Sequence, residues 1–391
     1  MHITTANQVA WCGLAINAGS RDESEGQHGL AHFVEHTIFK GTTHRRAWHI
    51  LNRMERVGGE LNAYTTKEGT MLYSVFPHQH LERAIDLLAD LVQWSVFPQE
   101  ELDRERDVVL EEAASYRDTP SDAVYDDFED LLLARSELGH NILGKKEDLQ
   151  NLTRQDCMHY LKTLYVPGNM AFFSVGPERP ERVFRWAEKY FGGMSHAQAP
   201  RQRVVPPVVA PFKHCIHIGT HQAHTIVGAR VPDMNHPLRH ALMLLNNILG
   251  GPGMNSLLNV ELRERRGYVY TVESALTLLS DCGWLEIYLG CDADDVRSSL
   301  HVIDRITSRL SRELLPERRL EAYKKQYCGQ LVVAADNTEF LAMRAGRGLL
   351  YHGHVAAVDD TIARIQAVTP EEITQVAAFL TADRLSSLTF E

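Results

Sequence analysis

The sequence contains 391 residues, more than one ordinary hydrophobic core accommodates and enough for two domains of roughly 200 residues each. Hydrophobic residues make up 44% of the chain and charged residues 23%, which excludes a disordered chain and makes a disulfide framework unnecessary. A formal net charge of −11 without a long basic run excludes an extended nucleic-acid-binding face. The acidity either steers basic peptides toward the protein or only keeps it soluble.

The six cysteines form no C-x-x-C pair, which favours reduced thiols and a cytoplasmic location. The first ten residues carry no basic segment of the kind that opens a signal peptide. No apolar stretch is long enough to span a membrane, so we expect no membrane partner.

The first half of the sequence alternates strand and helix patterns. Gly41 ends the first helix, and Thr43 is the expected N-cap of the second. The expected elements are a strand at 9–18, a helix at 29–39, a helix from 44 to 57, strands at 61–66 and 70–76, and amphipathic helices at 81–96 and 100–116.

A Pro-rich, polar stretch at 196–211 is the expected linker between domains 1–195 and 212–391. The second half repeats the order of the first, and Thr153 and Thr369 each open a helix that leads to a final strand. We therefore predict an internal duplication of an α+β domain. The expected elements here are a strand at 215–231, helices at 238–249 and 256–265, and strands at 268–278 and 284–289.

The segment His32-Phe33-Val34-Glu35-His36 is the candidate for chemistry. Residues three and four apart share one face of a helix, so the two histidines can hold one metal ion with Glu35 beside them. Two imidazoles and a carboxylate are a usual ligand set for catalytic zinc. The competing interpretation is a surface helix with two solvated histidines.

The helix expected at 100–116 offers the third ligand. Glu105 and Glu112 lie two turns apart on its apolar face, which runs through Leu102, Val109, Ala113 and Tyr116. Carboxylates on a buried face are costly unless they are paired or bind metal, whereas Glu111 lies on the wet face. We therefore predict Glu112 as ligand and Glu105 as the residue that orients a ligand histidine, with an ion pair to Arg104 or Arg106 as the alternative for Glu105.

At this point the sequence resembles the pitrilysin family of inverzincin metallopeptidases, most closely its mitochondrial-processing-peptidase branch. In order along the chain, the matching blocks are Gly29-Leu30-Ala31-His32-Phe33-Val34-Glu35-His36, Gly58-Gly59-Glu60-Leu61-Asn62-Ala63-Tyr64-Thr65 and Glu105-Arg106-Asp107-Val108-Val109-Leu110-Glu111-Glu112. A glycine-rich loop at 249–256 and the block 261–270 match in the second half. Members of the family often begin with an extra strand, so we expect the first sheet here to be one strand short.

The resemblance implies two duplicated α+β domains, each a mostly antiparallel sheet packed with helices, that together form half of a clamshell. It implies one Zn²⁺ per chain on His32, His36 and Glu112, with Glu35 as general base and Glu105 behind a ligand. Arg263 and Tyr270 would bind substrate and assist catalysis from the second domain. The substrate-binding edge strand would comprise Asn62, Ala63, Tyr64 and Thr65.

The same resemblance implies a zinc endopeptidase that cuts unfolded or short peptides in a chamber closed by two chains. We expect a homodimer, with a heterodimer containing a degenerate partner and a non-catalytic structural subunit as the alternatives. Tyr268 competes with Tyr270, because both would lie on one face of a strand, and only the family spacing selects Tyr270. No second metal site is expected among His214, His217, His221, His224 and His240.

Overall fold

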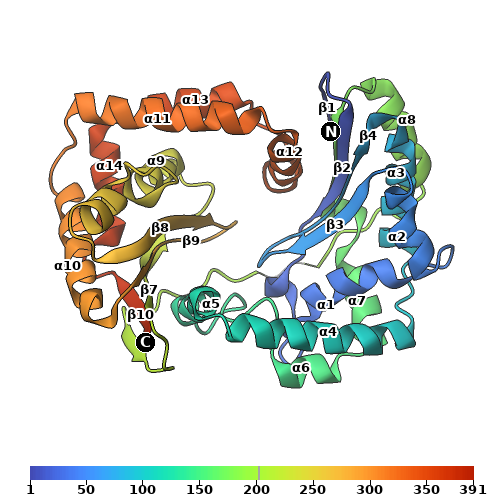
Figure 1. The fold of residues 1–391 in the computed structure, drawn as a ribbon. Helices are drawn as coiled ribbons and strands as arrows, with labels where there is room; N and C mark the ends of the chain where they lie inside the picture. Colours follow the sequence, from blue (N-terminus) through green and yellow to red (C-terminus); the bar gives the residue numbers. More distant parts are fainter. Residues whose placement is uncertain (201–202) are drawn as a thin grey trace. The chain divides into compact units, whose positions relative to one another are not determined.

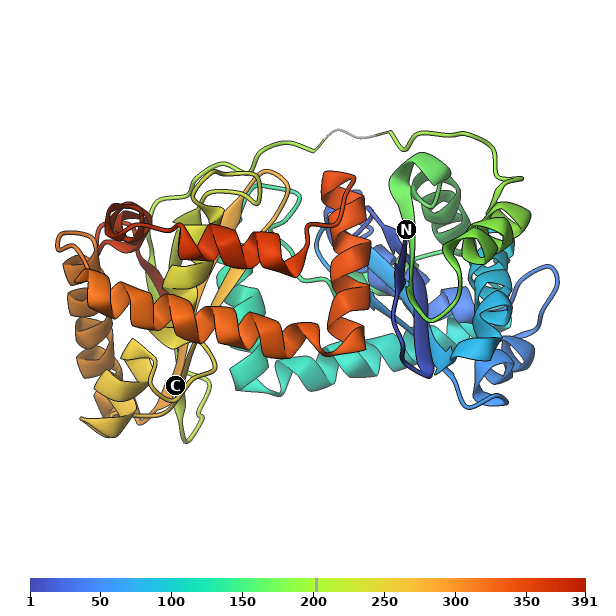
Figure 2. The same ribbon diagram turned by 90° about the horizontal axis from the view of Figure 1, so that it is seen from above.

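The structure, a computed structural model, describes residues 1–200 and 203–391. Residues 201 and 202, part of the expected linker, lie outside the described residues. Figures 1 and 2 show the fold in two perpendicular views. Within the described ranges, no helix is long and apolar enough to cross a membrane.

The first sheet has five strands: β1 (His2–Thr4), β2 (Val9–Ile16), β3 (Glu60–Thr65), β4 (Thr70–Pro77) and β5 (Met170–Gly176). Their order is β1-β5-β2-β4-β3, with β1 parallel to β5 and the other neighbours antiparallel. The expectation of a missing strand is therefore wrong. The short segment β1 pairs with residues far along the chain, a contact that no local pattern indicates.

The second sheet repeats this topology. Its strands are β6 (Lys213–Ile216), β7 (Ala223–Val231), β8 (Val269–Leu278), β9 (Gly283–Cys291) and β10 (Ser386–Phe390). Their order, β6-β10-β7-β9-β8, matches the first sheet strand for strand, including the parallel pair of β6 and β10. The predicted duplication and the α+β fold with two mostly antiparallel sheets are confirmed.

The helices that lead to the last strand of each half begin with the same local device. Thr153 and Thr369 are N-caps whose side chains accept the backbone N–H of Asp156 and Glu372, respectively. Those acidic side chains accept the N–H of the cap residue in return. Each capping box satisfies two helix-end donors that would otherwise lack partners.

Helices cover one face of each sheet (Figures 1 and 2). On the first sheet, inward residues of β2 such as Leu14 and Ile16 pack on Phe33 and Leu88. The helices of the first half are α1 (Leu30–Thr37), α2 (Ala47–Glu55), α3 (Leu81–Trp94), α4 (Gln99–Arg117), α5 (Pro120–Leu132), α6 (Lys146–Asn151), α7 (Arg154–Leu164) and α8 (Pro180–Phe191). Those of the second half are α9 (Arg239–Gly250), α10 (Ala293–Leu310), α11 (Glu317–Ala335), α12 (Thr338–His352), α13 (Val358–Gln366) and α14 (Pro370–Ala377).

The chain forms two compact units that differ from the contiguous domains 1–195 and 212–391. Unit 1 comprises residues 1–114, 140–204 and 334–356, and unit 2 comprises the remainder of the described chain. The halves thus exchange one helix each: α12 belongs to unit 1 and α5 to unit 2.

The exchanged helices cover the second face of each sheet. In unit 1, Ala342 and Ala345 of α12 pack on Ala15, Met71 and Phe173. In unit 2, α5 packs on β7, β9 and β10 through Val124, Phe128 and Leu132. A sheet that is apolar on both faces needs a layer on each side, which explains why the boundaries predicted from the linker are not those of the compact units.

Two local predictions were wrong, and a third, the helix expected at 256–265, is present with a different hydrogen-bonding pattern. The second helix begins at Ala47 and its N-cap is Arg46, not Thr43. Thr42 accepts the backbone N–H groups of His44 and Arg45 in the turn before this helix. The strand expected at 215–231 is two strands, β6 and β7. The helix expected at 256–265 contains a π-helix over Asn259–Glu264.

Gly346 tests the packing of α12. A Cβ atom there would lie 2.9 Å from the buried Phe173 ring and 3.0 Å from Met71 Cε. We expect Gly346→Val to lower the free energy of unfolding by about 1–3 kcal/mol, measured by urea denaturation, because the added side chain would overpack the contact between α12 and the sheet. Gly329→Val, at a helical glycine with nothing within 4 Å, is the matched control and should change it by less than about 0.5 kcal/mol. Equal effects of the two changes would contradict this packing.

Candidate metal centre

The start of helix α1 is fixed by a residue outside the helix. Its N-cap is Gly29, whose φ of 98° is left-handed and which has no side chain to cap the helix. The carboxylate of Glu23 does this instead, accepting the backbone N–H of Gly29 at 2.9 Å and of Ala31 at 2.7 Å. His140 Nε2 lies 3.0 Å from the same carboxylate, and burial raises the pKa of Glu23. Sequence reasoning missed Glu23, because it lies outside the motif.

The two histidines of α1 point to the same place. One turn apart, His32 and His36 bring their Nε2 atoms to 3.1 Å from each other. Burial first, and then the neighbouring His36, lowers the pKa of His32 to about 4. His32 is therefore a neutral imidazole near pH 7, the form that binds metals.

Glu112 of α4 completes the group. Its Oε2 lies 3.4 Å from His36 Nε2 and its Oε1 lies 4.0 Å from His32 Nε2, with the side chain 41% exposed. The neighbouring Glu111 is exposed, as the helical-face argument predicted. Tyr116 is also 43% exposed, contrary to that argument, because the apolar face ends before the last turn of α4, which enters unit 2.

The donor set fits zinc. Zinc–ligand bonds of about 2.0–2.1 Å at tetrahedral angles separate the ligand atoms by roughly 3.3 Å. The separations of 3.1, 3.4 and 4.0 Å among His32, His36 and Glu112 bracket that value. Three protein ligands are also the number that catalytic zinc sites use, which leaves the fourth coordination position for water.

Glu105 contacts the far side of the His36 ring. His36 Nδ1 lies 3.1 Å from Glu105 Oε1, and Lys40 Nζ lies 2.5 Å from Glu105 Oε2. The two arginines considered as alternative partners bond elsewhere: Arg104 pairs with Glu101, and Arg106 has other partners. A carboxylate that accepts the free N–H of a ligand histidine fixes the ring and its tautomer.

Arg106 holds α4 against the elements around α1. Its guanidinium donates to the backbone carbonyls of Leu149 and Leu152 and lies 5.4 Å from the centre of the Phe33 ring. Phe33 is the α1 residue next to His32. The sequence predicted Arg106 only as a possible partner of Glu105. Its contact with the two carbonyls could not be predicted, because they belong to a separate segment of the chain.

Glu35 links α1 to the edge of the first sheet. Its Oε2 accepts a hydrogen bond of 2.9 Å from Thr65 Oγ1, at the end of β3. Burial raises the pKa of Glu35, and the Thr65 hydroxyl works against that shift. A carboxyl with a raised pKa next to a candidate metal centre is a usual feature of a general base.

The edge-strand candidates all lie in β3, which pairs only with β4 among the described residues. Side chains alternate along it. Thr65 points to α1, whereas Tyr64 points to α12, where Arg347 donates to its hydroxyl at 3.2 Å. Asn62 and Ala63 precede them in the same strand. Because β3 is the last strand of its sheet, its outer backbone edge is available for pairing.

Arg263 and Tyr270 lie in unit 2. Arg263 belongs to the π-helix and lines a cavity of about 500 Å³ with the glycine-rich loop. Tyr270 occupies a β-bulge between Val269 and Thr271, is 54% exposed and donates to Asp292 at 3.0 Å. Tyr268 instead precedes β8 and packs on the core. The prediction that both tyrosines share a strand face was wrong, because a bulge redirects the side chain.

The other histidines form no comparable centre among the described residues. His224 bonds to the Tyr288 hydroxyl at 2.8 Å. His217 lies within 4.8 Å of Cys215 and Glu391, but the Cys215 and His217 side chains are on the surface. Glu391 escaped sequence reasoning because β6 and β10 join residues from opposite ends of the second half.

Comparisons with known proteins agree in one family. Residues 2–146 match the family described as Insulinase (Peptidase family M16), and residues 151–327 match the one described as Peptidase M16 inactive domain. His32, Glu35, His36 and Glu112 all lie in the first match.

Relatives match over nearly the whole chain. An uncharacterized zinc protease of Mycobacterium tuberculosis is 32% identical over 376 residues, covering 95% of this chain and 86% of the relative. The uncharacterized zinc protease YmxG of Bacillus subtilis is 32% identical over 373 residues, covering 95% of this chain and 90% of the relative. A probable mitochondrial-processing peptidase subunit beta of Arabidopsis thaliana is 29% identical over 381 residues, covering 95% of this chain and 72% of the relative.

Solved structures share the fold. A protease from Helicobacter pylori has a TM-score of 0.91 at 20% identity and covers 100% of this chain and 96% of its own. A peptidase M16 inactive domain from Pseudomonas fluorescens has a TM-score of 0.92 at 18% identity, and the match covers 100% of this chain and 94% of that structure.

Glu105 gives a test of the metal centre. We expect Glu105→Ala to weaken zinc binding about 10- to 100-fold, because His36 loses the acceptor that fixes its ring. Competition with a chromogenic chelator measures the affinity. The exposed neighbour supplies the control: Glu111→Ala should bind zinc like the wild type. Unchanged affinity in Glu105→Ala would show that this contact does not organise the centre.

Proposed function

This chain belongs to peptidase family M16, as its sequence blocks predicted, and we propose that it is a zinc-dependent endopeptidase that hydrolyses unfolded or short peptides. His32 and His36 of α1 converge with Glu112 of α4, and Glu35 lies on α1 beside the two histidines. This convergence is the observation that carries the proposal. Relatives that are named zinc proteases support it.

His32, His36 and Glu112 would hold one zinc ion per chain. When bound, zinc supplies a Lewis acid that acidifies water and polarises a peptide carbonyl. Glu105 accepts the Nδ1–H of His36 and keeps Nε2 directed at the ion, while Lys40 holds Glu105 in turn. The His36 ring therefore does not need to reorient when a substrate binds.

Glu35 is the proposed general base. Its carboxylate accepts a proton from the attacking water and then delivers it to the nitrogen of the leaving amine. Burial raises its pKa, which makes the carboxylate a better base than one in bulk water. The hydrogen bond from Thr65 fixes this carboxylate beside the end of β3.

The substrate would bind along β3 as an added strand. Asn62, Ala63, Tyr64 and Thr65 offer backbone N–H and C=O groups at the outer edge, and an extended peptide satisfies them by β-addition. Because Thr65 contacts Glu35, a peptide on this edge would pass close to the base. Folded proteins offer no free strand for such pairing, so unfolded or short peptides are the expected substrates.

We propose that Arg263 and Tyr270 also act on the substrate. A guanidinium and a phenol are suited to donate hydrogen bonds to substrate carbonyls and to a developing oxyanion. We also propose that two such chains pair around a chamber. One chain carries all the proposed residues, so a homodimer is sufficient, while a heterodimer with a degenerate homologue is the alternative. The Arabidopsis relative is named as a subunit.

A non-catalytic structural role is the second candidate, supported by the description of residues 151–327 as resembling an inactive domain. Zinc content and cleavage of a quenched fluorescent peptide distinguish the two. A chain that binds no zinc and cleaves no peptide is a structural subunit.

The base has a direct test. We expect Glu35→Gln to keep one zinc per chain and to lower the rate of peptide hydrolysis about 10²- to 10⁴-fold, because the amide still accepts the Thr65 bond but cannot take a proton. His36→Ala should lose zinc as well as activity, and Glu111→Gln should keep both. Elemental analysis and a fluorogenic peptide assay give the two readouts. Cleavage by Glu35→Gln at the parental rate would remove Glu35 from the mechanism.

Pairing of two chains predicts a concentration dependence. Light scattering should give twice the chain mass, and specific activity should fall on dilution below the dissociation constant, because a closed chamber needs both chains. A monomer whose specific activity is constant across the dilution series would refute the shared chamber and leave the zinc chemistry untouched.

A further inference from the structure

A basic cavity lies in unit 1, away from the residues proposed for hydrolysis. It has a volume of about 320 Å³, the share of roughly ten liquid water molecules, and its walls come from α2, α3 and the turn before α2. Its lining includes Arg45, Arg53, Arg56 and Arg83. Four guanidinium groups around one small cavity are unexpected in a chain with a net charge of −11.

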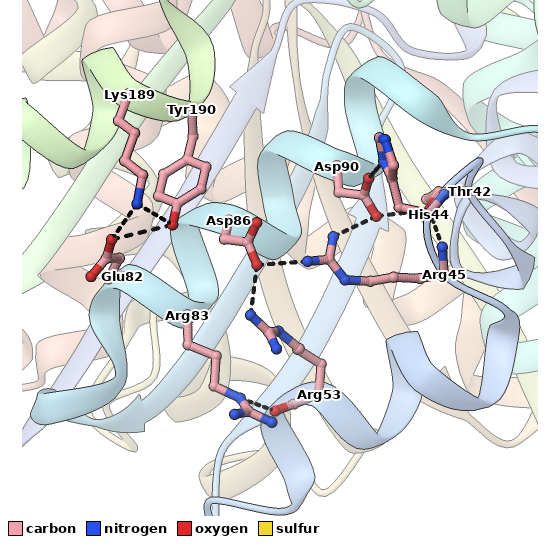
Figure 3. Close-up of polar contacts among 10 residues, drawn as sticks. All are labelled: Thr42, His44, Arg45, Arg53, Glu82, Arg83, Asp86, Asp90, Lys189 and Tyr190. Atoms are coloured by element: carbon pink, nitrogen blue, oxygen red, sulfur yellow. Dashed lines mark hydrogen bonds and ion pairs between the residues drawn. The ribbon is translucent and has the colours of Figure 1, made fainter.

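Two carboxylates of α3 neutralise only part of this charge (Figure 3). Asp86 pairs with Arg45 at 2.7 Å and with Arg53 at 2.6 Å. Asp90 pairs with Arg45 at 2.6 Å and with His44 at 2.6 Å, and it also accepts a bond from the Thr42 hydroxyl. These contacts fix the position of Arg45 and Arg53 and occupy both acids.

A third acid of α3 is bound elsewhere. Glu82 accepts hydrogen bonds from Lys189 at 2.9 Å and from the Tyr190 hydroxyl at 3.2 Å, both on α8 (Figure 3). It is therefore engaged with α8, and it is not one of the residues that line the cavity.

Arg56 and Arg83 form no ion pair with any described residue. Arg83 donates its Nε–H to the backbone carbonyl of Arg53, and Arg56 stacks over the Trp48 ring with 4.7 Å between its Cζ and the ring centre. The Nε of Arg53 is buried and has no hydrogen-bond partner in the described chain. The cavity thus presents surplus positive charge and guanidinium N–H donors.

The arginines repel one another. Burial first, and then the charges of Arg53 and Arg56, lowers the pKa of Arg83. Asp86 opposes this shift only in part. Like charges held close together with too few counterions cost free energy, and an anion in the cavity would reduce that cost.

We propose that this cavity binds the phosphate groups of a small, multiply charged anion. A guanidinium presents N–H donors in a planar fork that matches two phosphate oxygens, and Arg56 and Arg83 have such donors available. Asp86 and Asp90 position the other two arginines in advance, so little side-chain entropy is lost on binding. A compact anion fills a cavity of this volume better than an extended acidic peptide does.

Titration calorimetry on the full chain tests the proposal with tripolyphosphate and inorganic phosphate as probes. Tripolyphosphate should bind more tightly, because it carries more charge. Arg56→Gln and Arg83→Gln should each weaken tripolyphosphate binding about tenfold, the loss of one charge-assisted contact. Arg182→Gln is the matched control, since Arg182 stacks over Trp186 at 4.6 Å as Arg56 does over Trp48, and it should change binding by less than about twofold.

Each other outcome counts against the proposal. Wild-type affinity in both cavity variants would overturn it, and equal weakening in Arg182→Gln would indicate diffuse attraction without a site. Tighter binding of hexaglutamate than of tripolyphosphate would assign the cavity to an acidic protein segment instead. Thermal melting checks that each variant folds. Tripolyphosphate should raise the melting temperature of the wild type and raise it less in Arg56→Gln, whose substituted side chain is exposed.

Discussion

The contact between α1 and α4 is the constraint on which the candidate site depends. Neither helix carries a complete ligand set: α1 supplies two imidazoles, and α4 supplies Glu112 on one side of the His36 ring and Glu105 on the other. One imidazole therefore lies between two carboxylates of a single helix, two turns apart. A shift of α4 by one residue would displace both at once.

Several contacts outside the motif hold this arrangement. Glu23 fixes where α1 begins, Arg106 ties α4 to two carbonyls and to Phe33, and Lys40 holds Glu105. The duplicated sheet in unit 2 has the same strand order but lacks these elements of the centre, and His240 has no Glu-His after it. The fold was thus duplicated more fully than the candidate metal centre, since a common scaffold does not require a common site.

Charge serves different purposes in different parts of unit 1. Arg21 and Glu68 form a fully buried ion pair at 2.5 Å, and Arg203 joins it through Glu68 and Asp22, which ties the middle of the predicted linker to this unit. There the cations and carboxylates are matched, as burial demands. In the cavity between α2 and α3 they are not, and this imbalance distinguishes a cluster that only stabilises the fold from one that can take a ligand.

The sequence by itself determined most of the elements and the location of the candidate metal centre, because both are recorded locally. Helical periodicity placed His32, Glu35 and His36 on one helix and separated Glu112 from Glu111, and the capping residues Thr153 and Thr369 marked the duplication. Only the tertiary structure decided the rest. The pairing of β1 with β5, the exchange of α5 and α12, the engagement of Lys40 with Glu105 and the bulge that exposes Tyr270 all join segments distant in sequence or depend on a neighbouring strand. Such contacts are chosen by the burial of sheet faces and the pairing of charges, which no single segment encodes.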